Sequence, residues 1–297
     1  MTIQFTCPNC DNLIAFDSKH IGKRASCQSC GQVFIIPSKD FEEPEIVETE
    51  VEIPEPVPGF YRAVFVDSWK VFADGENATS LVFVVAAVCF KFFLARGACC
   101  LNYITFIAVW GWLFGFYFNI ISETALGGDK LPEITLGTGG MFFWNMVKPL
   151  FVFFTTLFIV WMPVIIMLAM LQNRGITFRN MWQIELGPRL LLQAFFLLGL
   201  FLFPAAILSM VVAADITLLR PDYLFSPIRR ALGPYLVVFA LLITAAVLES
   251  QTRQFTGANP AATIAYLALN LGVQVVAIIA MRSVGLFYRH YGCYFLW

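Results

Sequence analysis

Long apolar runs alternate with short polar segments from about residue 79 to residue 281. A helix needs about 20 apolar residues to cross the hydrocarbon core of a bilayer, and these runs approach or exceed that length. The pattern predicts six membrane-spanning helices, at residues 79–95, 99–121, 149–171, 190–213, 234–249 and 260–281. Pro163 and Pro204 fall inside two of them, where each removes a helix hydrogen bond and is expected to bend its helix.

The segment before these runs, residues 60–78, is amphipathic. Its apolar residues recur at helical spacing, and its charged residues lie mostly off that stripe; the stripe consists of Phe60, Val64, Phe65, Trp69 and Phe72. This favours a helix lying at the membrane surface, with Trp69 at the level of the headgroups. A soluble helix packed on the membrane domain fits the same pattern, and the sequence does not distinguish the two.

The first 37 residues carry two Cys-x-x-Cys pairs, Cys7/Cys10 and Cys27/Cys30, with sixteen residues between the pairs. This spacing is typical of a structural zinc ribbon, in which four thiolates surround one Zn²⁺ ion. Apolar residues on either side of each pair predict the short strands of two hairpins. Because so short a segment builds little core, we expect the metal to supply most of its folding free energy, about 10–16 kcal/mol in comparable peptides.

Three alternatives concern this head: iron as the metal, His20 as a ligand, and a basic cluster that binds nucleic acid. Iron in a rubredoxin-like site is the lesser alternative, and His20 is interpreted as a surface residue because four sulfurs already complete the coordination. Lys19, Lys23 and Arg24 form a small basic cluster of a size that is ordinary for a solvated turn. We therefore expect a structural metal without an open catalytic position, and no nucleic-acid partner.

Residues 38–59 form an acidic, proline-rich linker, and eight of the chain's 20 acidic residues lie between Asp40 and Glu55. Repulsion between like charges and the stiffness of proline favour an extended tether. The predicted organisation is a zinc ribbon at 1–37, this linker, an amphipathic interfacial helix at 60–78 and a transmembrane domain at 79–297.

Composition supports a lipid-embedded protein. Apolar residues make up 59% of the 297 positions and charged residues 13%, against about 25% charged in soluble domains. The predicted fold class is mainly α: a polytopic helical bundle of about six spans with a small N-terminal β zinc ribbon.

Flanking basic residues predict the orientation in an inner (cell) membrane. If the N-terminus is cytoplasmic, nine Lys and Arg residues flank the spans on the inside and five on the outside. The inside set is Arg62, Lys70, Lys130, Lys148, Arg220, Arg229, Arg230, Arg282 and Arg289; the outside set is Arg96, Arg174, Arg179, Arg189 and Arg253. The positive-inside rule then places both termini in the cytoplasm, where a reducing environment also preserves thiolate ligands.

The membrane part offers few residues for chemistry. The chain has two histidines and no motif typical of a metalloprotease, a serine hydrolase or a P-loop, so we expect no enzyme. Asp215, near the end of the fourth run, is the candidate intramembrane polar site, unless the helix ends near Val212 and leaves it at the interface. Lys91 is expected to extend toward the near end of its helix. Six amide side chains are candidates for hydrogen bonds between helices: Asn102, Asn119, Asn145, Gln193, Asn270 and Gln274.

Several stretches resemble known bacterial membrane proteins. The opening FTCPNC…CQSCGQVFIIP resembles the zinc-ribbon heads of planctomycete-type membrane proteins. GGDKLPEI, FWNMVKPL, LFLFPAAILSMVVAADI, PIRRALGPYLVVF and MRSVGLFYRHYG are similar to multi-pass families of the Yip1-like and domain-of-unknown-function kind. The resemblance covers most of residues 60–297 and implies membership without an activity. The end of the chain departs from it, since Cys293, Tyr294 and Phe295 stand where polar residues are usual.

Two functions follow as expectations. The first is an adaptor or scaffold, in which the zinc ribbon contacts an unknown protein partner while the bundle stays in the lipid bilayer. The alternative is a transporter or channel component that the ribbon regulates, with Asp215 in a hydrated cavity.

Overall fold

The structure is a computed structural model. It describes residues 2–7, 9, 10, 12–38, 55–94, 99–134, 140–172, 176, 186–253, 255 and 259–295. Within these ranges, it describes the backbone but not the side chains of residues 94, 99–106, 141, 142 and 186. The chain divides into two compact units, Met1–Pro54 and Glu55–Trp297. The division falls within the predicted linker 38–59, most of which lies outside the described residues.

The N-terminal unit is built from two antiparallel hairpins, as predicted. Strand β1 (Thr2–Thr6) pairs with β2 (Leu13–Asp17), and β3 (Arg24–Ser26) pairs with β4 (Val33–Ile35). Phe5 and Phe34 come from different hairpins and are fully buried, with their rings edge to face at 5.3 Å. The ring of Phe34 also lies edge to face with that of Phe16 at 6.4 Å, so aromatic contacts join the two hairpins.

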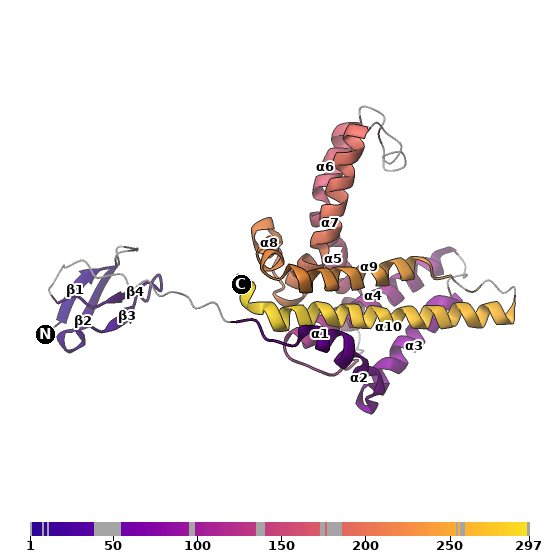
Figure 1. Cartoon of the computed structure of the whole chain (residues 1–297), viewed down its shortest axis with the longest axis horizontal. Coiled ribbons are helices and arrows are strands. Elements are labelled where there is room, and N and C mark those ends of the chain that lie inside the picture. The colour runs from indigo at the N-terminus through magenta and orange to yellow at the C-terminus, as the bar shows by residue number, and fades with distance from the viewer. Residues whose placement is uncertain are drawn as a thin grey trace. The chain divides into compact units, whose positions relative to one another are not determined.

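The second unit is a bundle of helices (Figure 1). Its helices are α1 (Phe60–Arg62), α2 (Ser68–Ala73), α3 (Ala78–Leu94), α4 (Cys99–Ala125), α5 (Gly140–Val160), α6 (Met162–Leu171), α7 (Leu186–Val212), α8 (Pro221–Arg230), α9 (Leu232–Ser250) and α10 (Pro260–Tyr291). The fold is therefore mainly α with a small β head, as the sequence predicted.

Five helical segments are long and apolar enough to cross a membrane among the described residues: Gly75–Phe93, Phe143–Val160, Gly187–Val212, Leu232–Ser250 and Pro260–Tyr294. These segments make the chain a membrane protein. Helix α4 occupies the place of the predicted second span and is 27 residues long, about 40 Å at 1.5 Å per residue.

The predicted span at 149–171 is divided in two. Helix α5 ends at Val160 and α6 begins at Met162, with Trp161 out of helical geometry at φ −95° and ψ 8°. Pro163 accounts for the break, because its ring excludes the preceding turn of a continuous helix and it has no N–H to donate. The apolar span therefore begins earlier than predicted, at Phe143. Pro204, in contrast, lies inside α7, which continues through it.

Close approach of backbones fixes the central helix pairs. A Cβ at Gly285 on α10 would lie 2.6 Å from the carbonyl oxygen of Ile121 on α4, and one at Gly111 would lie 2.4 Å from the carbonyl oxygen of Met146 on α5. Glycine at such crossings lets membrane helices pack at short range. Helix α4 is thus held between α5 and α10.

Hydrogen bonds tie the connecting segments together at one end of the bundle. The backbone N–H of Leu131 donates to Asn77 Oδ1 over 2.8 Å, and the N–H of Val57 donates to the carbonyl of His290 over 2.9 Å. At the opposite end, the N–H of Phe255 donates to the carbonyl of Phe92 over 3.1 Å. Helices α3 and α4 therefore run in opposite directions, and the start of the unit lies at the same end as the end of α10.

The amphipathic segment 60–78 is helical over Phe60–Ala73, with a π-helical turn at Ala63–Asp67. Its predicted apolar stripe is divided between two faces. Phe60 and Val64 are buried, and the Phe60 ring lies edge-on to His290 of α10 at 5.9 Å. Phe65 and Trp69 are more than half exposed, so an apolar surface remains on the outer face.

Candidate functional site

The four head cysteines form one cluster. Cys7 and Cys27 directly follow β1 and β3, and each begins a turn that carries the second cysteine of its pair. The ligand atoms of Cys7, Cys10, Cys27 and Cys30 all lie within 4.8 Å of one another. The sulfurs of Cys7 and Cys30 are 3.6 Å apart, and those of Cys10 and Cys27 are 3.8 Å apart. Sulfurs that surround a tetrahedral ion at about 2.3 Å are separated by about 3.8 Å, so the cluster can hold a metal ion.

The backbone around the cluster is shaped by short-range contacts. The N–H of Cys7 donates to the carbonyl of Asn12, and the N–H of Cys27 to that of Gln32, each over 2.9 Å. Gly31 has φ +77°, a conformation that a residue with a Cβ rarely adopts. These contacts close each turn so that its two sulfurs face the same point.

The sulfurs differ in environment. Cys7 and Cys27 are buried against the aromatic core, and Cys10 and Cys30 are at the surface. The backbone N–H of Gln32, which donates to the sulfur, lowers the pKa of Cys30 to about 6. The thiolate is the form that binds metal, so this hydrogen bond favours ligation. His20 ends a short 3-10 turn and does not belong to the cluster.

Asp215 lies beyond the end of α7, which corresponds to the interfacial alternative of the sequence prediction and not to an intramembrane polar site. Helix α7 ends at Val212, and Asp215 is exposed and caps the following 3-10 turn by accepting the N–H of Thr217 over 2.9 Å. That hydrogen bond lowers the pKa of the Asp215 carboxyl. The structure thus gives Asp215 a capping role at the end of the bundle.

A polar network lies instead at the opposite end. Lys91 of α3 forms an ion pair with Glu249 of α9, and the two side chains are 12% and 22% exposed. The Nε2 of Gln274 on α10 donates to the other carboxylate oxygen of Glu249 over 3.2 Å, and the hydroxyl of Tyr117 on α4 donates to Gln274 Oε1. Four helices are therefore joined by one chain of polar contacts.

Gln274 was one of six amides predicted to hydrogen-bond between helices, but this network was not predicted. Lys91 was expected to extend toward water, and no role was predicted for Glu249. One signal was available: Lys91 is the single charged residue of α3, and Glu249 is the single charged residue of α9. Opposite charges at the ends of two apolar helices are expected to pair, because an unpaired charge there is costly.

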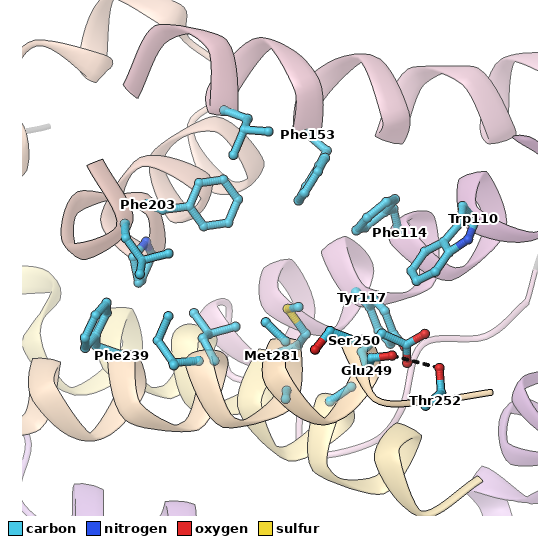
Figure 2. A pocket seen from close by; sticks show the side chains of 18 of the residues that line it. Trp110, Phe114, Tyr117, Phe153, Phe203, Phe239, Glu249, Ser250, Thr252 and Met281 are labelled. Atoms are coloured by element: carbon cyan, nitrogen blue, oxygen red, sulfur yellow. Dashed lines mark hydrogen bonds between the residues drawn. The ribbon is translucent and has the colours of Figure 1, made fainter. Parts of the chain in front are cut away.

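Beside the network lies a cavity of about 930 Å³ between α3, α4, α5, α7, α9 and α10. Its polar residues gather at one end, where Figure 2 shows Glu249, Ser250 and Thr252 near Tyr117. The other end is aromatic and is lined by Phe153, Phe203 and Phe239. The amino group of Lys91 lies 5.0 Å from the centre of the Trp110 ring, a cation–π contact.

A second polar cluster lies at the end of the bundle that carries Asp129. Arg282 is 4% exposed and donates from Nη1 to the backbone carbonyl of Asp129 over 2.9 Å. Arg289, two turns further along α10, donates to the Asp129 carboxylate over 2.8 Å. Asp129 thus pins the turn after α4 to α10.

Comparisons of this chain with protein-family models, with curated proteins and with solved structures find no match. The resemblance drawn from the sequence stays a prediction.

Proposed function

We propose that the chain is an adaptor or scaffold of the cell's inner membrane, in which a cytoplasmic, zinc-folded head recognises a protein partner. The observation that carries this proposal is the four-cysteine cluster at the junction of two small hairpins. Four sulfurs fill a tetrahedral site and leave no open position for a catalytic water, so the ion acts by folding the head. A rigid head that forms a unit separate from the helices suits recognition.

Two observations support the proposed orientation. The start of the helical unit and the end of α10 lie at the same end of the bundle, where Val57 and His290 are hydrogen-bonded. Basic residues gather in the segments of this end, among them Arg229, Arg230 and Arg289. The positive-inside rule assigns such an end to the cytoplasm, where thiolate ligands also stay reduced.

Cross-linking in cells tests the adaptor. We expect the partners recovered with the native chain to be lost with Cys7→Ser/Cys30→Ser, which removes two of the four ligands. Cys89→Ser is the matched control, because Cys89 lies on α3 and outside the cluster. Recovery of the same partners with all three chains would overturn the proposal.

The alternative function is a transporter or channel component regulated by the zinc ribbon. The sequence suggested it because of Asp215, but the observation that favours it is a cavity elsewhere in the bundle. Asp215 does not line the cavity of about 930 Å³, but this cavity lies beside the Lys91–Glu249 pair. Transport requires that this cavity be reached from both sides of the membrane. Labelling of Ala246→Cys by an impermeant thiol reagent from both sides supports transport, and labelling from one side or neither counts against it.

A further inference from the structure

We propose that the cavity of about 930 Å³ beside the Lys91–Glu249 pair binds one zwitterionic, amine-bearing lipid of the phosphatidylethanolamine class. Its acyl chain lies among Phe153, Phe203 and Phe239, and its head lies at the Lys91–Glu249 pair. The proposal is independent of the adaptor function, because it concerns the membrane unit alone.

The size and lining of the cavity fit an acyl chain. Its volume, about 930 Å³, is near the upper end of the range of about 300–1,000 Å³ for ligand pockets. Aromatic and aliphatic side chains from α5, α7 and α9 line the end away from the charges (Figure 2). Water is poorly accommodated between such walls, because it finds no hydrogen-bond partners there.

Polarity along α9 sets the direction of the ligand. Phe239 and Glu249 lie ten positions apart on one helix, which is about 15 Å at 1.5 Å per residue. Phe239 contacts the aromatic end of the cavity, and Glu249, Ser250 and Thr252 mark its polar end. A molecule with an apolar tail and a polar head matches this gradient in one orientation.

The charges at the polar end of the cavity determine which lipid headgroup fits there. Lys91 and Glu249 pair with each other, so the site carries no net charge. A lipid headgroup with one net charge would bring an unpaired charge into a low-dielectric site, and burying such a charge is unfavourable in free energy. A zwitterion avoids this cost, because its phosphate lies near the ammonium of Lys91 and its ammonium near the carboxylate of Glu249.

Hydrogen bonding favours an amine over a quaternary ammonium. The hydroxyl of Ser250 donates to the carbonyl of Val247, and that of Thr252 to the carbonyl of Glu249, each over 2.7 Å. Each hydroxyl oxygen retains the capacity to accept a hydrogen bond. Ethanolamine offers N–H donors to these acceptors, whereas choline offers none.

Photolabelling of the full-length protein in phosphatidylcholine nanodiscs tests the site. The probe is a phosphatidylethanolamine with a diazirine near the end of its acyl chain, and adducts are mapped by mass spectrometry. We expect saturable labelling of the peptides that contain Phe203 and Phe239. Unlabelled phosphatidylethanolamine should compete about tenfold better than phosphatidylcholine or phosphatidylglycerol, a difference of ~1.4 kcal/mol.

Two adjacent positions on α9 provide a matched pair of variants. Ala246 lines the cavity, whereas Val247 is 53% exposed and lies outside its lining. Ala246→Trp should reduce specific labelling about tenfold, and Val247→Trp should leave it unchanged. Labelling that does not saturate, or that responds equally to both substitutions, identifies bulk bilayer lipid and overturns the proposal.

Variants of Glu249 and Lys91 test where the lipid headgroup lies. Glu249→Gln leaves Lys91 unpaired and should improve competition by the anionic phosphatidylglycerol, whereas Lys91→Gln should weaken it. The double variant restores neutrality and is expected to restore the native order. If the native protein, the two single variants and the double variant gave the same order of competitors, the lipid headgroup would have to lie elsewhere, and this assignment would be overturned. Comparison with the double variant controls for loss of folding.

Discussion

Lys91 and Glu249 lie 158 positions apart and form an ion pair between α3 and α9. Gln274 and Tyr117 extend this contact to α10 and α4, so the pair closes a polar chain across four helices. Each of these two charges belongs to an otherwise uncharged helix, and the ion pair gives each of them a partner.

Breaking the pair on one side should destabilise the bundle. For Lys91→Met we expect a loss of about 3 kcal/mol in the free energy of unfolding, the low end for removing one partner of a buried pair. Chemical unfolding of the purified protein in detergent measures the loss. The double variant Lys91→Met/Glu249→Gln should recover most of it, because no uncompensated charge remains; a double variant less stable than either single one would contradict this explanation.

The crossing of α10 and α4 should tolerate no added methyl group. Gly285→Ala places a Cβ 2.6 Å from the carbonyl oxygen of Ile121, and we expect a loss of about 1–3 kcal/mol as the helices separate. Gly272→Ala is the matched control on the same helix, because nothing lies within 4 Å of its added Cβ. This control should be neutral or gain about 0.5–1 kcal/mol from the greater helix propensity of alanine. Equal effects in detergent unfolding would argue against the close crossing.

Metal removal should unfold the head and leave the helices intact. We expect one zinc ion per chain by elemental analysis, and rapid proteolysis within residues 2–38 after chelation, because the small core does not fold without the ion. Helical circular dichroism should change little. Cys30→Ser should reproduce the effect of chelation, and Cys89→Ser should not; purified protein that holds iron, or four oxidised cysteines, would refute the zinc assignment.

The two ends of the bundle should be labelled from opposite sides of the membrane. Leu126 and Gln251 are exposed and lie after the last turns of α4 and α9. In inverted vesicles, an impermeant maleimide should label Leu126→Cys and not Gln251→Cys, and in intact cells stripped of their outer layers the order should reverse. Peptide mapping separates these adducts from those on native cysteines. Labelling of both positions from one side would contradict the proposed topology.

Features set by neighbouring residues were predictable from the sequence. The spacing of Cys7, Cys10, Cys27 and Cys30 predicted the hairpins and a cluster of sulfurs able to hold a metal ion, because each Cys-x-x-Cys turn is a local structure. The lengths of the apolar runs predicted the membrane helices, and Pro163 predicted a distortion in its run. The charged residues within these helices were harder to interpret, because a side chain at a helix end can extend to water or find a partner.

The sequence by itself determined that this protein has a four-cysteine head able to hold a metal ion and a helical unit apolar enough to span a membrane, because both follow from spacing and local apolarity. Only the tertiary structure decided that Lys91 pairs with Glu249, that Arg282 and Arg289 hold Asp129, and that Asp215 caps a surface turn. These contacts depend on how each helix is rotated and on where it crosses its neighbours. Backbone approaches such as that of Gly285 to Ile121 fix those crossings, and they join residues that are far apart along the chain.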